Sequence, residues 1–253
     1  MTPSRIPKIA LDAGHGLTTP GKQTPDGIKE WDLNDRVRDK IAAILSNYYV
    51  EIVHLDNDEG SVDEPLIDRL RLYKKLQVCL VASIHHNATI GKWNTATGVE
   101  VFTDRNPTQQ DLKLANLIYN KLVNYTGLKG RGIKQANFTI INQNSIPAVL
   151  IEGGFMDGTN DYIYITSNNG QAAYARAVAE AIIEFLNLQK KEITMENKFV
   201  DINQSFAKKD INELFEMGIV NGKTESRFMP TETVTREELA AVIRRTIRYI
   251  TGK

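Results

Sequence analysis

Most of this chain alternates short apolar runs with longer amphipathic patterns, and that alternation is the strongest constraint on its fold. Runs typical of strands occupy residues 9–11, 50–55, 78–84, 98–103 and 147–151. Apolar residues at helical spacing lie between or after them, around residues 33–45, 66–76, 112–122 and 172–188. This order, sustained over roughly the first 187 residues, predicts an α/β fold with a mostly parallel sheet flanked by helices.

The composition is that of an ordinary globular protein, with 42% hydrophobic and 25% charged residues. Formal net charge is zero, which gives no sign of the basic excess typical of nucleic-acid binders, so we expect no nucleic-acid partner. The single cysteine, Cys79, lies in an apolar run and is interpreted as a small buried residue; one cysteine excludes an intramolecular disulfide and a four-thiolate zinc site. No apolar run reaches the ~18 residues of a membrane span. The first residues contain no apolar signal-peptide segment, so we expect synthesis in the cytoplasm without a signal peptide.

The chain is expected to contain a second, smaller module. Residues 189–198 are mostly polar and are typical of a linker. Two helical patterns follow, and Gly218 is a suitable end for the first of them. The second begins with Thr235 and Glu238 at the spacing of a capping box. We therefore predict a domain over residues 1–188, a linker over 189–198 and a mainly helical module over 199–253.

Histidines and carboxylates that suit a metal site lie where predicted strands end. His15 follows the first strand between two glycines, and the pair His85–His86 ends the third; because side chains alternate along a strand, at most one of that pair faces a given site. Glu30 precedes the first helix and Glu152 ends the last strand. Ligands bind beyond the carboxyl ends of strands in open α/β sheets, and two imidazoles with a carboxylate suit a catalytic zinc. Each of these residues alone is weak evidence, so the prediction rests on their occurring together at strand ends and loops. His54 is interpreted as structural.

Four segments in order resemble the signature of the zinc-dependent N-acetylmuramoyl-L-alanine amidases: LDAGHG at 11–16, Glu30, SIHHNA at 83–88 and IPAVLIEGGF at 146–155. The likeness covers roughly residues 6–187 and includes KGRGIK at 129–134, which is similar to an Arg-Gly turn of the family. The resemblance implies that His15, Glu30 and His85 bind one Zn²⁺ and that Glu152 is the catalytic acid/base. Alignment of the motif selects the first histidine of the doubled pair, leaving His86 as structural. The implied substrate is peptidoglycan, cut between the lactyl group of N-acetylmuramic acid and L-alanine.

The last module resembles one S-layer-homology repeat, a family that attaches proteins to secondary cell-wall polymers. Arg236 is a candidate anion contact there. The alternative is a small helical module in which Thr235 only caps a helix.

Two other functions stay open beside the amidase. One is a zinc peptidase that cuts stem or cross-bridge peptides, and the other is a wall-binding protein without catalysis. The loop over residues 17–26 resembles that of phage lysins. A phage lysin and an autolysin of sporulating cells are both consistent with an enzyme that acts at the bacterial wall after release.

Overall fold

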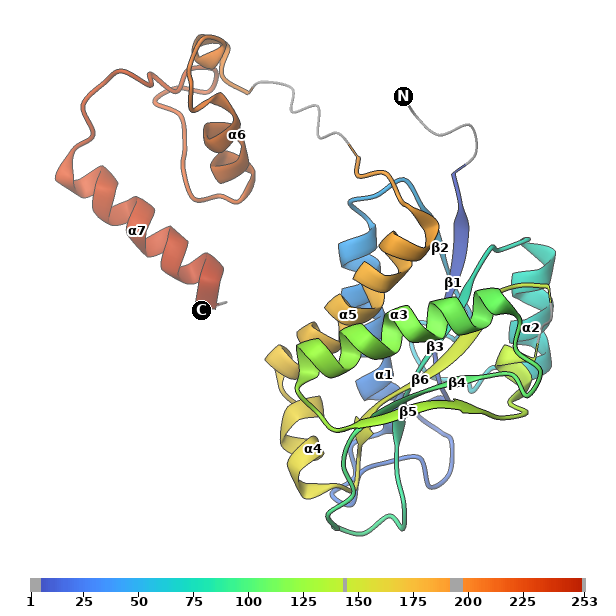
Figure 1. The fold of residues 1–253 in the computed structure, drawn as a ribbon. Coiled ribbons are helices and arrows are strands. Elements are labelled where there is room, and N and C mark those ends of the chain that lie inside the picture. Colours follow the sequence, from blue (N-terminus) through green and yellow to red (C-terminus); the bar gives the residue numbers. More distant parts are fainter. Residues whose placement is uncertain (1–5, 143–144, 192–197, 252–253) are drawn as a thin grey trace. The chain divides into compact units, whose positions relative to one another are not determined.

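Strands and helices alternate through the first part of the chain, as the sequence predicts (Figure 1). The computed structural model describes residues 6–142, 145–191 and 198–251, and its contacts divide into two units, Met1–Lys191 and Glu192–Lys253. The N-terminal unit contains, in order, β1 (Lys8–Ala13), α1 (Glu30–Leu45), β2 (Glu51–His54), α2 (Leu66–Lys75), β3 (Val81–Asn87), β4 (Val99–Thr103), α3 (Gln109–Thr126), β5 (Gly130–Gln135), η1 (Thr139–Ile141), β6 (Ala148–Phe155), α4 (Thr159–Ile165) and α5 (Asn168–Leu186).

The six strands form one sheet in the order β2-β1-β3-β6-β4-β5. Every neighbouring pair is parallel except β4 and β6, which are antiparallel. The prediction of a mostly parallel sheet is therefore confirmed, with one reversed junction that the sequence did not reveal.

Two elements differ from the sequence prediction. Of residues 129–134, which were likened to a turn, residues 130–134 form most of the edge strand β5, and the short helix α4 had no predicted counterpart. Glycine has low strand propensity, and Gly132 has a positive φ of 91°, so β5 lacks the usual pattern of a strand. At 7 residues, α4 is too short to show helical periodicity.

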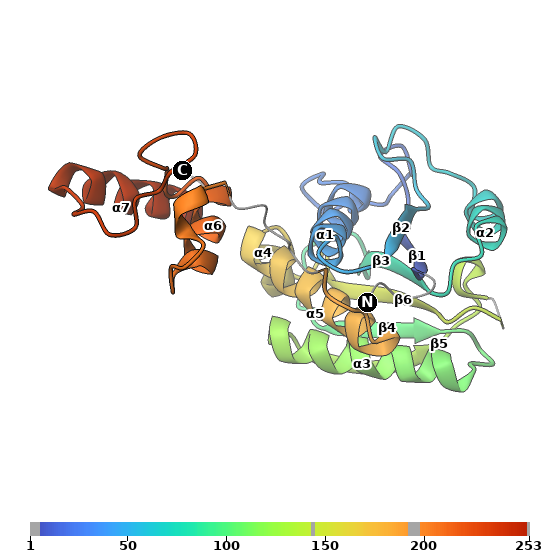
Figure 2. The same ribbon diagram turned by 90° about the horizontal axis from the view of Figure 1, so that it is seen from above.

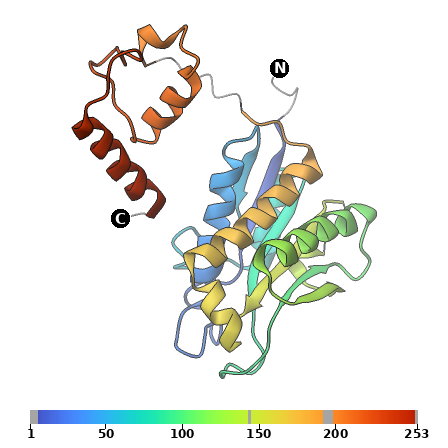
Figure 3. The same ribbon diagram turned by 60° about the vertical axis from the view of Figure 1, so that its left-hand side comes forward.

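Helices cover the two faces of the sheet unequally. Figure 2 shows α1, α3 and α5 on one face and α2 on the other, and in Figure 3 α3 and α5 cross the sheet side by side. The larger core lies under the three helices and includes Val37 and Ile41 of α1, which the helical spacing predicted. A smaller core lies under α2 and η1. Cys79 is only half-buried, so its predicted burial was wrong: it precedes β3, in a loop, and packs against the edge of the larger core.

One extra residue interrupts the pairing of β3 with β6. His85 pairs with Glu152 and Asn87 pairs with Phe155, so two steps along β3 match three steps along β6. Two glycines of β6, Gly153 and Gly154, allow this irregular pairing. A Cβ on Gly153 would lie 1.9 Å from the ring of Tyr174, and Gly154 has a φ of 136°, where glycine is favoured.

Backbone hydrogen bonds hold the segment after α5, residues 189–191, to the rest of the N-terminal unit. Tyr49 N donates to Gln189 O and Lys191 N donates to Asn47 O, so residues 189–191 of the predicted linker pair with the chain after α1. Most of the rest of that linker, residues 192–197, lies outside the described residues.

The C-terminal unit is small and mainly helical, with η2 (Val200–Ile202), α6 (Lys208–Glu216) and α7 (Arg236–Thr251). Phe199, Ile202 and Ile211 form its core. The predicted capping box is confirmed: Thr235 N donates to Glu238 Oε2 (2.8 Å) and Glu238 N donates to Thr235 Oγ1 (3.1 Å). Across the described residues of both units, no helix has the length and apolar character needed to cross a membrane.

Candidate metal centre

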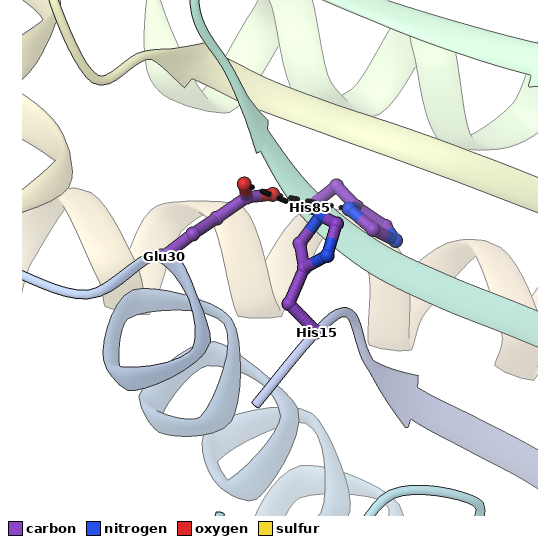
Figure 4. A group of neighbouring side chains, drawn as sticks. All are labelled: His15, Glu30 and His85. Carbon is purple, nitrogen blue, oxygen red and sulfur yellow. Dashed lines mark hydrogen bonds and ion pairs between the residues drawn. The ribbon is translucent and has the colours of Figure 1, made fainter. Parts of the chain in front are cut away.

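Three of the four predicted site residues meet near the carboxyl ends of the central strands β1 and β3 (Figure 4). His15 follows β1, Glu30 is the first residue of α1, and His85 lies in β3. His15 Nε2 is 3.3 Å from Glu30 Oε2, and His85 Nδ1 is 3.0 Å from Glu30 Oε1. One ligand atom from each residue lies within 4.8 Å of the others, and no second group of this kind occurs among the described residues. Two imidazoles and a carboxylate at this separation fit a divalent cation such as zinc.

The backbone at His15 is unusual and is held from two sides. His15 has a φ of 69°, in the left-handed region that costs a residue with a Cβ about 1–2 kcal/mol. Arg69 of α2 donates from Nη2 to His15 O (2.9 Å) and from Nη1 to Ala13 O (3.0 Å). The neighbouring Gly14 leaves room for the other imidazole, because a Cβ there would lie 2.0 Å from Cε1 of His85.

Two buried ion pairs secure the same turn. Arg69 Nη1 lies 2.6 Å from Asp12 Oδ1, and both side chains are 1% exposed. Arg38 of α1 lies 2.7 Å from Asp56, whose other oxygen accepts the N–H of Ala13 at 3.0 Å. Buried charges are tolerated only when they are paired and hydrogen-bonded. These pairs therefore fix the chain on both sides of the turn that carries His15.

The electrostatics favour ligand forms that can bind a cation. Burial lowers the pKa of His15 to about 4, so its imidazole is neutral at neutral pH. Burial alone would raise the pKa of Glu30, but the hydrogen bond and charge of His85, with the charge of His15, lower it to about 2. Glu30 also lies at the start of α1, where the helix dipole favours a negative charge.

His86 faces away from this group, as strand alternation predicts. It is 2% exposed, and its Nδ1 lies 2.8 Å from Asn34 Oδ1 on α1. Its ring also meets the edge of the Tyr174 ring of α5. His54 lies elsewhere, with its Nδ1 2.7 Å from Asp58 Oδ1.

The fourth predicted residue, Glu152, stands beside His85 in the sheet. The two are register partners in β6 and β3, so their side chains leave the sheet on the same face. Glu152 Oε2 is buried and has no hydrogen-bond partner among the described residues. Burial raises the pKa of Glu152 to about 8; the charges of Glu30 and Glu100 also raise it, while that of His85 opposes them. A carboxyl group with that pKa can exchange a proton near neutral pH, as a general acid/base must.

Sequence reasoning missed the residues that support the group, above all Arg69, Asp56 and Glu100. The available signal for Arg69 was its spacing of four residues from Tyr73, since both are buried on the inner side of α2.

This chain is similar in sequence and in fold to several known proteins. Residues 9–184 match the N-acetylmuramoyl-L-alanine amidase family, and residues 198–240 match the S-layer homology domain. An endolysin of Bacillus phage SPP1 is 35% identical over 185 residues, 72% of this chain and 67% of the relative. A sporulation-specific N-acetylmuramoyl-L-alanine amidase of Bacillus subtilis (strain 168) is 27% identical, over 72% of this chain and 69% of its own length. The solved structure of an N-acetylmuramoyl-L-alanine amidase from Clostridium difficile 630 is 27% identical with a TM-score of 0.68, covering 73% of this chain and 98% of that one.

Proposed function

This chain belongs to the N-acetylmuramoyl-L-alanine amidase family, and we propose that it hydrolyses peptidoglycan with one Zn²⁺ held by His15, Glu30 and His85. The bond cut joins the lactyl group of N-acetylmuramic acid to L-alanine. The observation that carries the proposal is that ligand atoms of these three side chains, far apart in the sequence, lie within 4.8 Å of one another, with Glu152 paired with His85 in the sheet.

The donor set suits zinc on chemical grounds. Zinc in hydrolases commonly takes two imidazoles and one carboxylate and keeps a further position for water or substrate. A zinc ion held there supplies Lewis-acid polarisation of the scissile carbonyl and makes water more acidic. The chain's own part is to hold a neutral His15 and an ionised Glu30 in place, which the ion pairs of Arg69 and Arg38 support.

Glu152 is proposed as the general base and then the general acid. Its carboxylate takes a proton from the attacking water and passes it to the departing alanine nitrogen. Its buried Oε2 has no hydrogen-bond partner among the described residues that would compete for that proton.

The C-terminal unit is proposed to hold the enzyme on the wall. Its match to the S-layer homology domain supports binding of a cell-wall polymer, and we propose a secondary cell-wall polymer bound through residues 199–253, with Arg236 as an anion contact. On this proposal residues 1–188 form the catalytic domain, joined by a linker over 189–198. The site of action is the bacterial cell wall, reached after release.

Digestion of purified peptidoglycan, with and without a chelator, tests the proposal. Mass spectrometry should find new N-terminal alanine and free lactyl carboxyl groups, and the chelator should abolish both. Cuts within the stem or cross-bridge peptides would instead identify a zinc peptidase. Retention on walls with no new end groups would identify a binding protein without catalysis.

A further inference from the structure

The segment Lys129–Lys134, which the sequence likened to a turn, has no part in the metal centre, yet the structure gives it a defined position. In β5, Arg131 Nε lies 2.8 Å from Glu100 Oε2, and Lys134 Nζ bonds the same oxygen. The other oxygen of Glu100 accepts a hydrogen bond from Asn87 Nδ2 at 2.7 Å. Two cations from the edge strand therefore converge on one buried carboxylate of β4.

The sheet register places the cluster of Glu100, Arg131 and Lys134 beside the proposed catalytic residues. Glu152 pairs with His85 on one side and with Glu100 on the other. Paired residues project from the same face, so His85, Glu152 and Glu100 form a row across β3, β6 and β4. The side chains of Arg131 and Lys134 on β5 reach this row through their bonds to Glu100, although the backbone of Lys134 pairs with Phe102. Neighbouring strands are about 4.8 Å apart, so the cations lie roughly 5–10 Å from the strand that carries Glu152.

The charges of the cluster do not cancel. Glu100 carries one negative charge and its side chain is 3% exposed, whereas the side chains of Arg131 and Lys134 are 33% and 39% exposed. Among the described residues, Glu100 is the only ion-pair partner of each cation. Burial alone would raise the pKa of Glu100, but hydrogen bonds from Lys134 and Arg131 hold it below its ordinary value. One net positive charge therefore remains, with donors that reach solvent.

Packing keeps both cations in place. The Arg131 guanidinium lies 4.8 Å from the centre of the Phe155 ring, and Lys134 Nζ lies 5.7 Å from that of Phe102. A cation held over a ring loses little further freedom when it binds an anion. If the pair served only to neutralise Glu100, one cation would suffice.

We propose that Arg131 and Lys134 form a subsite for a carboxylate of the peptide that leaves during hydrolysis, namely the free carboxylate of the second residue of an acidic stem peptide. This rests on the proposed function, because Glu152 must reach the leaving nitrogen and the peptide continues from that atom. In an extended peptide the second residue lies roughly 4–8 Å from that nitrogen. This range overlaps the roughly 5–10 Å that separates the strand of Glu152 from the two cations.

The test compares two soluble muropeptides that differ at one group. Their second stem residue is D-glutamate with a free α-carboxylate in one and its amide in the other, and both are γ-linked to the third residue. The full chain loaded with zinc should prefer the acid roughly tenfold in kcat/KM, mainly through KM, as expected for a charge-assisted hydrogen bond. Lys134→Met and Arg131→Gln should lower kcat/KM for the acid until it is close to that for the amide, so that the preference for the acid is lost.

Lys113→Met is the matched control, because Lys113 Nζ also lies over a phenylalanine ring, 5.5 Å from the centre of Phe185, but on α3. It should keep the preference for the acid. The released acidic stem peptide should also bind the metal-free full chain more tightly than its amide in isothermal titration calorimetry, and Lys134→Met should remove that difference.

Equal cleavage of the two muropeptides by the unaltered chain would overturn the subsite while leaving the proposed function intact. Equal losses of kcat/KM on the acid and the amide in the variants would also overturn the subsite, because an ion pair with a purely structural role predicts that result. Cleavage of neither muropeptide, with no release of stem peptide from whole peptidoglycan, would refute the proposed function and the subsite with it.

Discussion

Arg69→Met should destabilise the N-terminal unit far more than loss of an ordinary surface charge. The side chains of Arg69 and Asp12 are both 1% exposed. Without Arg69, the Asp12 carboxylate keeps one hydrogen-bond partner among the described residues, the hydroxyl of Ser83 at 2.5 Å. Removing one partner of a buried ion pair costs about 3–5 kcal/mol, because the other charge stays buried without compensation. Natural domains have only about 5–15 kcal/mol of total stability, so this loss is a large fraction of it.

Urea unfolding followed by tryptophan fluorescence measures this cost in one unit alone. Both tryptophans, Trp31 and Trp93, belong to the N-terminal unit, so the signal does not depend on the C-terminal unit. With an m-value of about 2–3 kcal/mol per molar urea, the midpoint should fall by roughly 1–2 M in the presence of chelator. Asp12→Asn combined with Arg69→Met should recover part of the loss, because the uncompensated charge is then gone.

Arg71→Met is the matched control on the same helix. Arg71 pairs with Asp68 at 2.9 Å, but the two side chains are 71% and 51% exposed. A pair so exposed contributes about 0–0.5 kcal/mol. Equal midpoints for the two variants, or a loss below about 1 kcal/mol in Arg69→Met, would refute the claim that the buried pair stabilises the turn at His15.

Three further predictions concern the catalytic residues and the C-terminal unit. Glu152→Gln should keep metal binding but lose about 10²–10⁴-fold in turnover, which is the usual contribution of a general acid/base. His15→Ala should lose both metal binding and turnover. Metal analysis and muropeptide digestion separate these outcomes, and an active Glu152→Gln would contradict the role assigned to Glu152. Burial raises the pKa of Glu152 from 4.5 to about 8, so the folded metal-free protein holds a proton that the unfolded chain releases. This contribution to stability is complete below pH 4.5 and is lost as the pH rises through 8. In chelator, the urea midpoint of Glu152→Gln should therefore fall less between these pH values than that of the unaltered chain. Parallel plots of midpoint against pH for the two proteins would contradict this prediction. Shortening the chain to residues 1–191 should leave the tryptophan-detected midpoint and the cleavage of soluble muropeptides unchanged but abolish sedimentation with cell walls; a lower midpoint would show that the two units stabilise each other.

The sequence could predict the metal site because histidine and carboxylate side chains at the ends of predicted strands point to metal binding. Histidines and carboxylates next to buried strands could be located because parallel strands bring their carboxyl ends together. His15, Glu30 and His85 do meet, and the structure places Glu152 beside them. The reversed pairing of β4 with β6 could not be predicted, since strand direction depends on connections that apolar patterns do not record.

The supporting residues escaped prediction because pattern reading assumes that apolar side chains face inward. Helix α2 does the opposite in part: Leu66, Ile67 and Leu72 are 37–49% exposed, while Arg69 is 2% exposed. An inward arginine is stable only with a carboxylate in the right place, and Asp12 lies 57 residues away in the sequence. The spacing of Arg69 from Tyr73 marks the buried side of α2, but the carboxylate partner belongs to the tertiary fold and no local pattern identifies it.

The extra residue in β6 separates the part of the strand that carries Glu152, the proposed acid/base, from the part that leads into the surrounding loops. Up to Glu152, β6 keeps strict register with β3, and beyond it the two chains are offset. Asp157, just past the offset, accepts the backbone N–H groups of Thr89, Ile90 and Gly91, and so ties the segment after β6 to the loop after β3. Insertions or exchanges in these two loops can then be absorbed without moving Glu152.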